Sequence, residues 1–459
     1  IPEYLPENCT GCMDCVTECP DTAILGKVIS EPALEEKLSH IADESDRSMF
    51  DEQWSRPRKY YDGPKKKGQP GGRFAIIIDP SKCKGCAECV TVCDDLALEM
   101  IPKTEPVMDK IRKSHRYFKQ VGPSDEAYIN DNLLVDMMLR EQTHIYVGGA
   151  GSCAGCGEGT ALRMLCAATG AKYADQWGIV AATGCNTVYT STYPYNPYLV
   201  PWTNSLFENA PADAMGVRMR WNQMGWQDKP LWCIGGDGAM FDIGFQSLSR
   251  LLASGLPVKV FVLDTQVYSN TGGQASTSSY TGQNTKMSNH GKLHDGKQER
   301  RKEIAQIAMM HPHTFVAQTT AAHANHFYKA VLGALEFDGP AIINCYTTCQ
   351  PEHGVADNMA GEQARLAVDT RAFPLLVYDP NKGTKIKEHL SLQGNPAMKE
   401  DWFTNPKTGE TVDFLSFARS EGRFVKHFDA EGKPSATILR AQQDRLENWR
   451  LLQELAGII

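Results

Sequence analysis

The pattern of apolar and polar positions is most regular between residues 144 and 375. In this region short runs of β-favouring residues alternate with longer amphipathic runs, as in Leu231–Gly235, Met240–Ala253 and Val258–Asp264. Strand, helix and strand joined by short turns are typical of a right-handed βαβ unit in a parallel sheet. We therefore expect an α/β domain, doubly wound around a parallel sheet, over 144–375.

The N-terminal part of the chain has a different pattern, rich in Cys, Pro and charge and poor in long periodic segments. Leu34, Leu38 and Ile41 have helical spacing, which predicts a short helix within Pro32–Phe50. The basic run from Arg56 to Lys67 is typical of a solvated loop, with a basic docking patch as the less favoured interpretation.

Two further segments complete the chain. Residues 111–143 are mixed and polar, which predicts a linker, and the tail from 376 is polar until a helix expected over Thr437–Leu455. We expect the apolar stripe of that helix to pack against a neighbouring element; it consists of Leu439, Leu446, Trp449 and Leu452.

Composition narrows the class of protein. The 459 residues carry a net charge of −8, which argues against nucleic-acid binding as the main task. No run of about 18 apolar residues is present, so we expect no membrane span. The chain begins at Ile1 without Met or a signal-peptide pattern, so we expect a missing or processed start, or a piece of a longer chain. Fifteen cysteines, most of them in spaced sets, favour a reducing compartment, the cytoplasm.

Eight of the cysteines form two runs with the same spacing, C-x2-C-x2-C-x3-C. In such a run three thiolates cap three corners of one 4Fe-4S cluster, and the fourth points toward the other cluster. We therefore predict one cluster on Cys9, Cys12, Cys15 and Cys93, and a second on Cys83, Cys86, Cys89 and Cys19. Zinc knuckles and redox thiols are the alternatives, but zinc sites usually combine two C-x2-C pairs in another pattern. The runs predict a ferredoxin-like α+β domain over 1–110.

A glycine-rich turn marks the α/β region. The predicted buried strand ends with Trp232-Cys-Ile-Gly-Gly236, and the chain continues through Asp237-Gly238-Ala239 into a helix. Backbone N–H groups at such a turn can approach phosphate, and Asp237 offers a hard oxygen ligand for Mg²⁺ on a diphosphate. Thr265 follows the next strand 28 residues later, the distance needed to return to the same sheet edge. The G-D-G turn alone is more often structural, but together the two segments resemble the thiamine-diphosphate signature, with Thr265 in place of the usual Asn and the Val267 carbonyl as third ligand.

Taken together, the motifs resemble the pyruvate:ferredoxin oxidoreductases, within the 2-oxoacid:ferredoxin oxidoreductase family. The resemblance covers nearly the whole chain and rests on the two cysteine runs, on the G-D-G region and on the strings Cys-Ala-Gly-Cys-Gly-Glu at 153–158, Ala-Thr-Gly-Cys at 182–185 and Tyr-Ser-Asn-Thr-Gly-Gly-Gln at 268–274. The last string is similar to the pyruvate branch rather than the 2-oxoglutarate branch.

The resemblance implies a third 4Fe-4S cluster near thiamine, held by Cys153, Cys156, Cys185 and Cys349. The spacing between Cys349 and His353 is slightly longer than the family pattern, so Cys345 is the alternative ligand.

The resemblance also implies contacts to thiamine and substrate. Glu158 would contact the aminopyrimidine, although it could instead cap a helix, and Asn270 would lie beside the substrate, although it could be a turn residue. The implied thiamine-diphosphate and Mg²⁺ site comprises Glu158, Gly236, Asp237, Gly238, Thr265, Val267, Tyr268, Ser269 and Asn270, with Asn270 and Glu158 as catalytic residues.

The implied activity is oxidative decarboxylation of pyruvate with coenzyme A, or the reverse synthase reaction, with electrons passing through three clusters to ferredoxin or flavodoxin. The chain would need partner subunits or domains that supply the thiamine-activating, substrate-gripping and coenzyme A-binding parts. The alternatives are another 2-oxo acid (2-oxoglutarate, oxalate or an aryl glyoxylate), a non-oxidative thiamine decarboxylase or carboligase, and a pure electron-transfer subunit.

Overall fold

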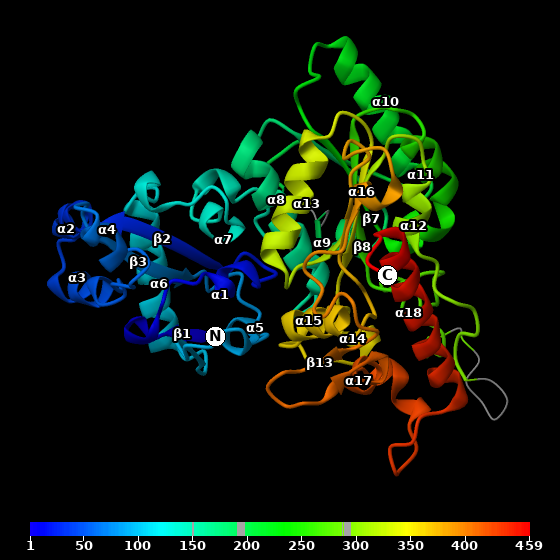
Figure 1. Ribbon diagram of the computed structural model, residues 1–459. Helices are drawn as coiled ribbons and strands as arrows, with labels where there is room; N and C mark the ends of the chain where they lie inside the picture. Colours follow the sequence, from blue (N-terminus) through cyan, green and yellow to red (C-terminus); the bar gives the residue numbers. More distant parts are fainter. Residues whose placement is uncertain (149–150, 191–197, 287, 289–294) are drawn as a thin grey trace. The chain divides into compact units, whose positions relative to one another are not determined.

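The computed structural model describes residues 1–148, 151–190, 198–286, 288 and 295–459, and the chain divides into two units (Figure 1). Unit 1 comprises Ile1–Asp175 and Asp357–Met359, and unit 2 comprises Gln176–Ala356 and Ala360–Ile459. This division differs from the expected one at 110, 143 and 375. The expected linker 111–143 lies inside unit 1, and helix α6 (Glu105–Gln120) runs through its first boundary because Phe118 is part of the unit 1 core. The C-terminal arm is likewise part of unit 2.

Unit 1 contains two antiparallel strand pairs. They are β1 (Pro2–Tyr4) with β4 (Leu98–Met100), and β2 (Ile24–Ser30) with β3 (Gly72–Ile78). Its helices are α1 (Asp14–Thr17), α2 (Glu31–Ser39), α3 (Glu44–Asp51), α4 (Asp62–Lys66), α5 (Glu88–Thr91), α6, α7 (Leu134–Met137) and α8 (Gly157–Tyr173). The short helices α1 and α5 each lie within one cysteine run.

The single helix predicted within Pro32–Phe50 is in fact two helices, α2 and α3. The chain breaks between them because Asp43 caps α3, its side chain accepting a hydrogen bond of 2.9 Å from the Asp46 N–H. Leu34 and Leu38 on α2 and Phe50 on α3 are buried in one apolar cluster against β3. The predicted helical spacing is therefore correct for α2 and fails at the cap.

Unit 2 is built on a mixed, mostly parallel sheet of eight strands. Their order is β12 (Leu390–Ser391), β11 (Leu376–Tyr378), β9 (Phe315–Thr320), β10 (Ala341–Tyr346), β8 (Val258–Asp264), β7 (Leu231–Gly236), β5 (Gly178–Ala182) and β6 (Trp202–Ser205). The six strands from β9 to β6 are parallel, whereas β11 and β12 join one edge in antiparallel fashion. The α/β class is confirmed, and the antiparallel edge departs from the wholly parallel sheet that was expected.

The chain reverses its direction of travel across this sheet between β5 and β7. From β5 it continues to β6 at the edge, and from β6 it returns to β7 on the other side of β5. Such a switch point opens a crevice outside the carboxyl ends of the strands, where ligands bind in doubly wound folds. The residues that follow β5, β7, β8 and β10 are therefore candidates for ligand binding.

Helices cover both faces of the sheet, with α13 on one side and α11 and α12 on the other (Figure 1). The helices of unit 2 are α9 (Cys185–Thr190), α10 (Ala210–Gln223), α11 (Phe245–Leu252), α12 (Ile304–Met309), α13 (Ala324–Glu336), α14 (Gln350–His353), α15 (Ala360–Asp369), α16 (Ile386–His389), α17 (Phe414–Ser420) and α18 (Ala436–Leu455), and β13 (Phe403–Thr404) pairs with β14 (Thr411–Val412). The helix predicted over Met240–Ala253 is divided at Gly244 into a π-helical turn, Gly238–Ile243, and α11.

The C-terminal helix α18 packs on unit 2 through part of the predicted stripe. Trp449 and Leu452 are buried, and the Trp449 indole donates a hydrogen bond of 2.9 Å to the Glu400 carbonyl, whereas Leu439 is exposed. No helix in the described part of the chain has both the length and the apolar character that a membrane crossing requires.

Candidate functional site

The first set of four cysteines lines one cavity in unit 1. Cys9, Cys12, Cys15 and Cys93 surround it together with apolar side chains such as Phe74. Burial raises the pKa of Cys9, and the neighbouring Cys93 raises it further, because two thiolates side by side repel each other. The structure therefore brings the last cysteine of the second run to the first three cysteines of the first run.

The second set shows the reciprocal arrangement. The pKa of Cys86 is raised to about 11, mainly by burial and in part by the like charge of Cys19, which also raises the pKa of Cys83 and Cys89. The two runs also share a backbone conformation, with left-handed residues at Gly11 and Met13 in one run and at Gly85 and Ala87 in the other. Two similar loops thus each present three thiols and exchange the fourth.

The two thiol sets can be compared with the needs of a single metal ion and of a cluster. Within the described residues, no three or more His, Cys, Asp or Glu side chains converge tightly enough to hold a single ion. Sulfurs bound to one zinc lie within about 4 Å of one another, since each Zn–S bond is about 2.3 Å. In a 4Fe-4S cluster each thiolate binds a different iron, so the sulfurs stand farther apart around a cavity. The thiols present fit a 4Fe-4S cluster, and the assignment of the clusters stays a prediction.

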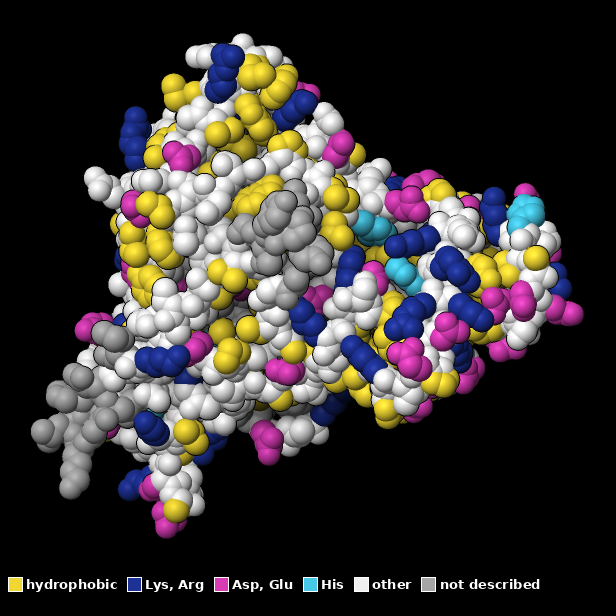
Figure 2. Space-filling model, turned by 180° about the vertical axis from the view of Figure 1, so that it is seen from behind, with side chains coloured by type: hydrophobic (Ala, Val, Ile, Leu, Met, Phe, Trp, Pro, Cys, Tyr) yellow, Lys and Arg dark blue, Asp and Glu magenta, His cyan; other side chains and the backbone are white. Residues whose placement is uncertain are grey.

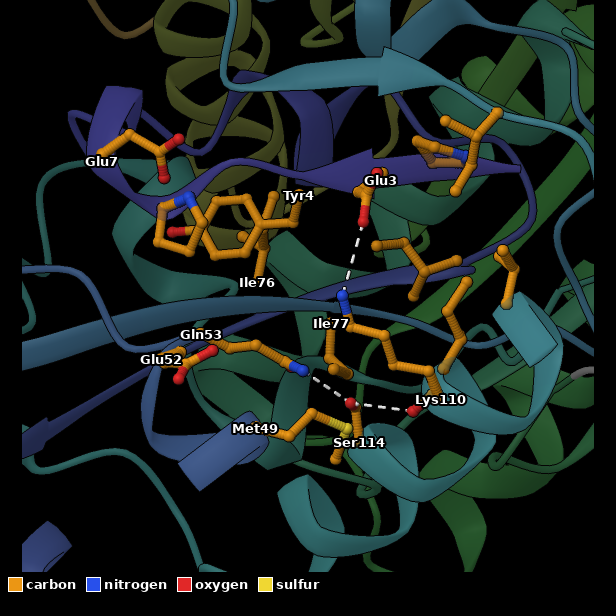
Figure 3. Close-up of a pocket in the computed structure, with 16 residues that line it drawn as sticks. Glu3, Tyr4, Glu7, Met49, Glu52, Gln53, Ile76, Ile77, Lys110 and Ser114 are labelled. Carbon is orange, nitrogen blue, oxygen red and sulfur yellow. Dashed lines mark hydrogen bonds and ion pairs between the residues drawn. The ribbon is translucent and has the colours of Figure 1, made fainter. Parts of the chain in front are cut away.

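A larger cavity of about 250 Å³ adjoins the first thiol set (Figure 3). Ile76 lines both cavities. At the rim Lys110 pairs with Glu3 at 3.4 Å, and Gln53 donates a hydrogen bond of 2.6 Å to Ser114. None of the described residues that line the larger cavity is a cysteine, whereas four cysteines line the smaller one.

A buried arginine that the sequence patterns did not reveal lies against the cysteine loops. Arg163 on α8 donates hydrogen bonds to three carbonyl oxygens of the first run and the strand after it, those of Cys19 at 2.9 Å, Ile24 at 2.8 Å and Val16. Burial lowers the pKa of its guanidinium, and the thiolates of Cys19 and Cys15 oppose that shift. The carboxylate of Asp21 favours the charged guanidinium as well, so both thiols and a carboxylate face this buried positive charge.

The cysteines assigned to a third cluster are divided between the units. Cys153 and Cys156 precede α8 in unit 1, and Cys185 and Cys349 belong to unit 2. Cys185 follows β5 and Cys349 follows β10, so both lie after the carboxyl ends of parallel strands. Cys345, the alternative ligand, is inside β10 and fully buried. Within unit 2 the placement favours Cys349, while the four-cysteine cluster itself stays a prediction.

Three oxygen atoms converge at the carboxyl ends of β7 and β8. The Thr265 hydroxyl lies 3.1 Å from Oδ1 of Asp237 and 3.0 Å from the Val267 carbonyl oxygen, and it can donate to either. These residues follow adjacent parallel strands, which is why they meet although 28 positions separate Asp237 from Thr265. All three are buried.

The separations suit magnesium. Ligands on adjacent corners of a Mg²⁺ octahedron with bonds of about 2.1 Å lie about 3 Å apart. The 3.1 and 3.0 Å separations around Thr265 therefore match two edges of such an octahedron. The residues present fit the metal that the sequence predicts, and the assignment of magnesium stays a prediction.

Hydroxyl groups hold the Asp237 carboxyl in place. Its Oδ2 accepts hydrogen bonds from Ser276 at 2.5 Å and Ser278 at 2.8 Å. Burial and, to a smaller extent, the nearby Asp264 raise the pKa of Asp237 to about 7, although the hydroxyl donors oppose the rise. The carboxyl is thus poised to exchange a proton for a cation near neutral pH. The two serines were not predicted as site residues, since a Ser-rich segment without periodicity is common in loops.

The glycine-rich turn is shaped by close packing. A Cβ atom at Gly238 would overlap the Tyr268 ring, so only glycine allows Tyr268 to pack there and to donate a hydrogen bond of 3.0 Å to Asp242. Gly236 is the last residue of β7, and the Ser269 hydroxyl donates to Oγ1 of Thr265 at 2.9 Å. The predicted cofactor residues of this turn therefore lie together around the three oxygens.

Asn270 occupies a tight turn. The turn is closed by backbone hydrogen bonds from Tyr268 to Gln274 at 2.9 Å and from Gly272 to Ser269 at 3.1 Å, and Asn270 is exposed. This position is compatible with contact to a substrate and with a turn role. Glu158 is buried in the first turn of α8, where Cys156 rather than Glu158 is the N-cap residue. Glu158 belongs to unit 1, so its predicted contact to thiamine stays a prediction.

Gln266, which separates two of the oxygen-bearing residues, was also missed by the sequence analysis. It has a positive φ of 56°, an unfavourable conformation for a residue with a side chain. Its carbonyl accepts hydrogen bonds from Ser279 at 2.6 Å and Gln283 at 2.8 Å, and its side-chain oxygen accepts one of 3.1 Å from Arg423. These contacts hold the backbone turn that directs the Val267 carbonyl toward Thr265. No sequence signal distinguishes such a residue before its neighbours are known.

His353 stabilises the segment that carries Thr265 and Val267 through a hydrogen bond to its backbone. Its Nε2 donates a hydrogen bond of 2.7 Å to the Thr265 carbonyl. Burial strongly lowers the pKa of His353, and Arg423 lowers it further, so the ring stays neutral. The C-terminal arm, through Arg423, therefore contributes to the geometry of the three-oxygen site.

Comparisons with known proteins were consistent with this geometry. Residues 182–345 match the family described as thiamine pyrophosphate enzyme, C-terminal TPP binding domain. The chain is 36% identical over 233 residues to pyruvate synthase subunit PorB of Pyrococcus horikoshii, covering 50% of this chain and 70% of that protein. All the residues of the three-oxygen site lie within the matched family region.

Two longer relatives match almost the whole chain. It is 28% identical over 471 residues to the probable pyruvate-flavodoxin oxidoreductase of Escherichia coli, covering 86% of this chain and 37% of that protein. It is 27% identical over 542 residues to the pyruvate:ferredoxin oxidoreductase of Moorella thermoacetica, covering 99% of this chain and 42% of that protein. The chain thus spans about two fifths of the length of these relatives.

Proposed function

Because this chain belongs to the pyruvate:ferredoxin and pyruvate:flavodoxin oxidoreductase family, we propose that it is the thiamine-diphosphate- and iron–sulfur-binding part of such an enzyme. The enzyme would convert pyruvate, coenzyme A and an oxidised carrier to acetyl-CoA, CO₂ and the reduced carrier, or run in reverse. A ferredoxin or flavodoxin would be the carrier.

One observation carries the proposal: the convergence of Asp237, Thr265 and the Val267 carbonyl at the carboxyl ends of two parallel strands. These oxygens would hold Mg²⁺ and, through it, the diphosphate, while the N–H groups of the turn at Gly238 approach the phosphates. Bound thiamine diphosphate supplies the nucleophilic carbon and the electron sink needed to cleave the bond beside a 2-oxo group. The chain's own residues bind, orient and neutralise the cofactor.

The cysteine sets supply the route for electrons. The sets Cys9, Cys12, Cys15, Cys93 and Cys83, Cys86, Cys89, Cys19 would each hold one 4Fe-4S cluster. Cys153, Cys156, Cys185 and Cys349 would hold a third cluster. Cys185 and Cys349 follow β5 and β10, at the same edge of the sheet as Asp237 and Thr265 after β7 and β8, and this position supports the proposal. Single-electron transfer needs these groups in one assembly, and a non-oxidative decarboxylase would have no use for them.

The proposal is tested first on cofactor binding by the anaerobically purified chain. Thiamine diphosphate should bind in the presence of Mg²⁺ and be released by EDTA, as followed by calorimetry. Asp237→Ala should abolish Mg²⁺-dependent binding while the iron content stays unchanged. Binding that is indifferent to Mg²⁺ and to this substitution would contradict the assigned site.

The reaction is tested on the complex purified anaerobically with its native partners. We expect reduction of ferredoxin with pyruvate that requires coenzyme A, and less with 2-oxoglutarate, oxalate or an aryl glyoxylate. If ferredoxin is reduced faster with one of the other acids, that acid would replace pyruvate as the proposed substrate, and the proposed enzyme class would be unchanged. Activity of the isolated chain would contradict the need for partner domains, and no activity with any 2-oxo acid would leave only an electron-transfer role.

A further inference from the structure

The segment between the cysteine runs carries a concentrated positive charge. Residues 56–67, here called the basic loop, contain six Lys and Arg side chains and a single acidic residue, and all six cations are exposed. Arg56 and Lys65 pair with Glu31, and Lys59 pairs with Asp136. The other three cations show no ion pair among the described residues; they are Arg58, Lys66 and Lys67. The basic loop therefore keeps a positive surface in a chain whose net charge is −8.

The basic loop is fixed to the first cysteine run. Its Pro57 and Tyr60 are buried, and a Cβ atom at Gly11 would lie 2.9 Å from the Tyr60 ring. Tyr60 also stacks on Phe74 at 5.4 Å between ring centroids. The adjacent Cys12 is the exposed cysteine of the first set. The positive surface and the outermost thiol of this set are thus neighbours.

The second cysteine set lies toward the other end of unit 1. Lys84, within the second run, donates hydrogen bonds of 2.8 Å to the Ser152 carbonyl and 2.8 Å to Asp21. Ser152 immediately precedes Cys153, and Thr91 of the same run accepts a hydrogen bond of 2.8 Å from Asn358. An electron that enters unit 1 at Cys153 would therefore meet the second set before the first. Within the two sets Cys12 is the exposed cysteine, so the first set, beside the basic loop, would be the point from which electrons leave the chain.

We propose that the basic loop and the surface around Cys12 form the docking site for an acidic one-electron carrier protein. The proposal rests on the electron-transfer function proposed above and adds the place and charge of the partner's contact. The cluster on the first set gives up one electron and the carrier gains it, so the step is balanced. An acidic carrier is repelled by a surface that is negative overall and attracted at this loop, which orients it with its redox centre toward Cys12. Figure 2 shows several Lys and Arg side chains, with Asp and Glu side chains among them, on the visible face of unit 1.

The test uses stopped-flow reduction of a purified acidic ferredoxin by the full chain, whose clusters have been reduced with dithionite. The electron donor is therefore independent of thiamine chemistry. The variant Arg58→Glu/Lys66→Glu/Lys67→Glu reverses the three unpaired charges of the loop. We expect the second-order rate at low ionic strength to fall roughly tenfold or more, since steering of this kind contributes about 10- to 1000-fold. The rates of variant and wild type should converge at high salt, because screening removes the attraction.

A matched variant carries the same charge change in unit 2, at the exposed lysines Lys329, Lys382 and Lys407. A second loop variant, Arg58→Gln/Lys66→Gln/Lys67→Gln, should give an intermediate rate, and cluster absorbance checks that both loop variants are loaded. Equal loss in the unit 2 variant, or a salt dependence unchanged in the loop variants, would overturn the docking site. The complex could lack thiamine-dependent activity while the loop variants still slow ferredoxin reduction. That result would support the docking site and contradict the proposed enzymatic function.

Discussion

Arg163 donates a hydrogen bond of 2.9 Å to the carbonyl oxygen of Cys19, which lies 144 residues earlier in the chain. The same guanidinium reaches the carbonyls of Val16 and Ile24. A helix that follows the Cys153–Cys156 pair therefore holds the loop that carries a cysteine of the second set. This contact places one positive charge in the interior between two predicted clusters.

Replacing Arg163 should change both stability and redox behaviour. Arg163→Met leaves three carbonyls without their donor, and at about 1–3 kcal/mol for each unsatisfied group the free energy of unfolding should fall by about 3 kcal/mol or more. The reduction potential of the nearby clusters should become more negative, because a positive charge that favours the added electron is lost. Arg163→Lys should keep most of the potential and only part of the stability. Denaturant unfolding and an EPR-monitored redox titration measure the two effects, and an unchanged potential in Arg163→Met would refute the electrostatic role.

The second predicted metal ligand can be tested by exchange. Thr265→Asn supplies an oxygen at the same position and should retain Mg²⁺-dependent binding of thiamine diphosphate. Thr265→Val has similar volume and no hydroxyl, so the affinity should fall about 10- to 100-fold, as when a group at a metal site is removed. Calorimetry measures both. Thr314→Val is the control, because Thr314 is a buried threonine bonded to a carbonyl at 3.1 Å before the amino end of β9, away from the three oxygens. Equal affinity in the two Thr265 variants would show that its oxygen is not a ligand.

Metal binding should depend on pH because of Asp237. Its pKa of about 7 in the folded, metal-free state lies above the usual value of 3.8, so a proton competes with Mg²⁺ below neutral pH. The affinity should be constant above about pH 8 and fall about tenfold per pH unit below pH 7. For the metal-free chain the sign is opposite: the folded state binds the proton more tightly than the unfolded state, so this group's contribution to stability decreases as pH rises from about 4 to 7.

Mg²⁺ titrations at pH 6, 7 and 8, followed by near-ultraviolet circular dichroism of bound thiamine diphosphate, would measure this profile. Ser278→Ala removes a donor that favours the ionised carboxyl, so the loss of affinity should begin at a higher pH. A flat profile between pH 6 and 8 is incompatible with the buried, protonatable carboxyl.

The third cluster is tested by iron content. Cys349→Ala should remove about four iron atoms per chain, the content of one 4Fe-4S cluster. Cys345→Ala should leave iron unchanged, because Cys345 is fully buried within β10. The reverse result would transfer the ligand role to Cys345. Both variants can be compared by iron and sulfide analysis after anaerobic purification.

Local sequence patterns were sufficient for elements whose conformation depends mainly on residues close in the sequence. The strand expected at Val258–Asp264 is β8 at the same bounds, because a short run rich in Val, Phe and Leu favours a strand without any information about its partners. The pattern predicts one helix after Gly238 because the spacing of apolar residues does not distinguish a π-helical turn from an α-helix. In the structure the two meet at Gly244, which lies close to the Phe207 carbonyl, remote in sequence. The two units divide the chain at other positions than the expected limits, and long-range packing contributes to this, since Phe118 joins a core built from the first half of unit 1.

The sequence by itself determined the chemistry that the chain offers: repeated thiols at fixed short spacing, and a carboxyl and a hydroxyl after two consecutive strands. Short spacing constrains a loop directly, and strand length constrains the return to one sheet edge, so both can be inferred from the order of residues. Only the tertiary structure decided which groups hold these residues in position. Arg163, Gln266, Ser278 and Arg423 act across long separations in the chain, where contact depends on how every intervening element packs.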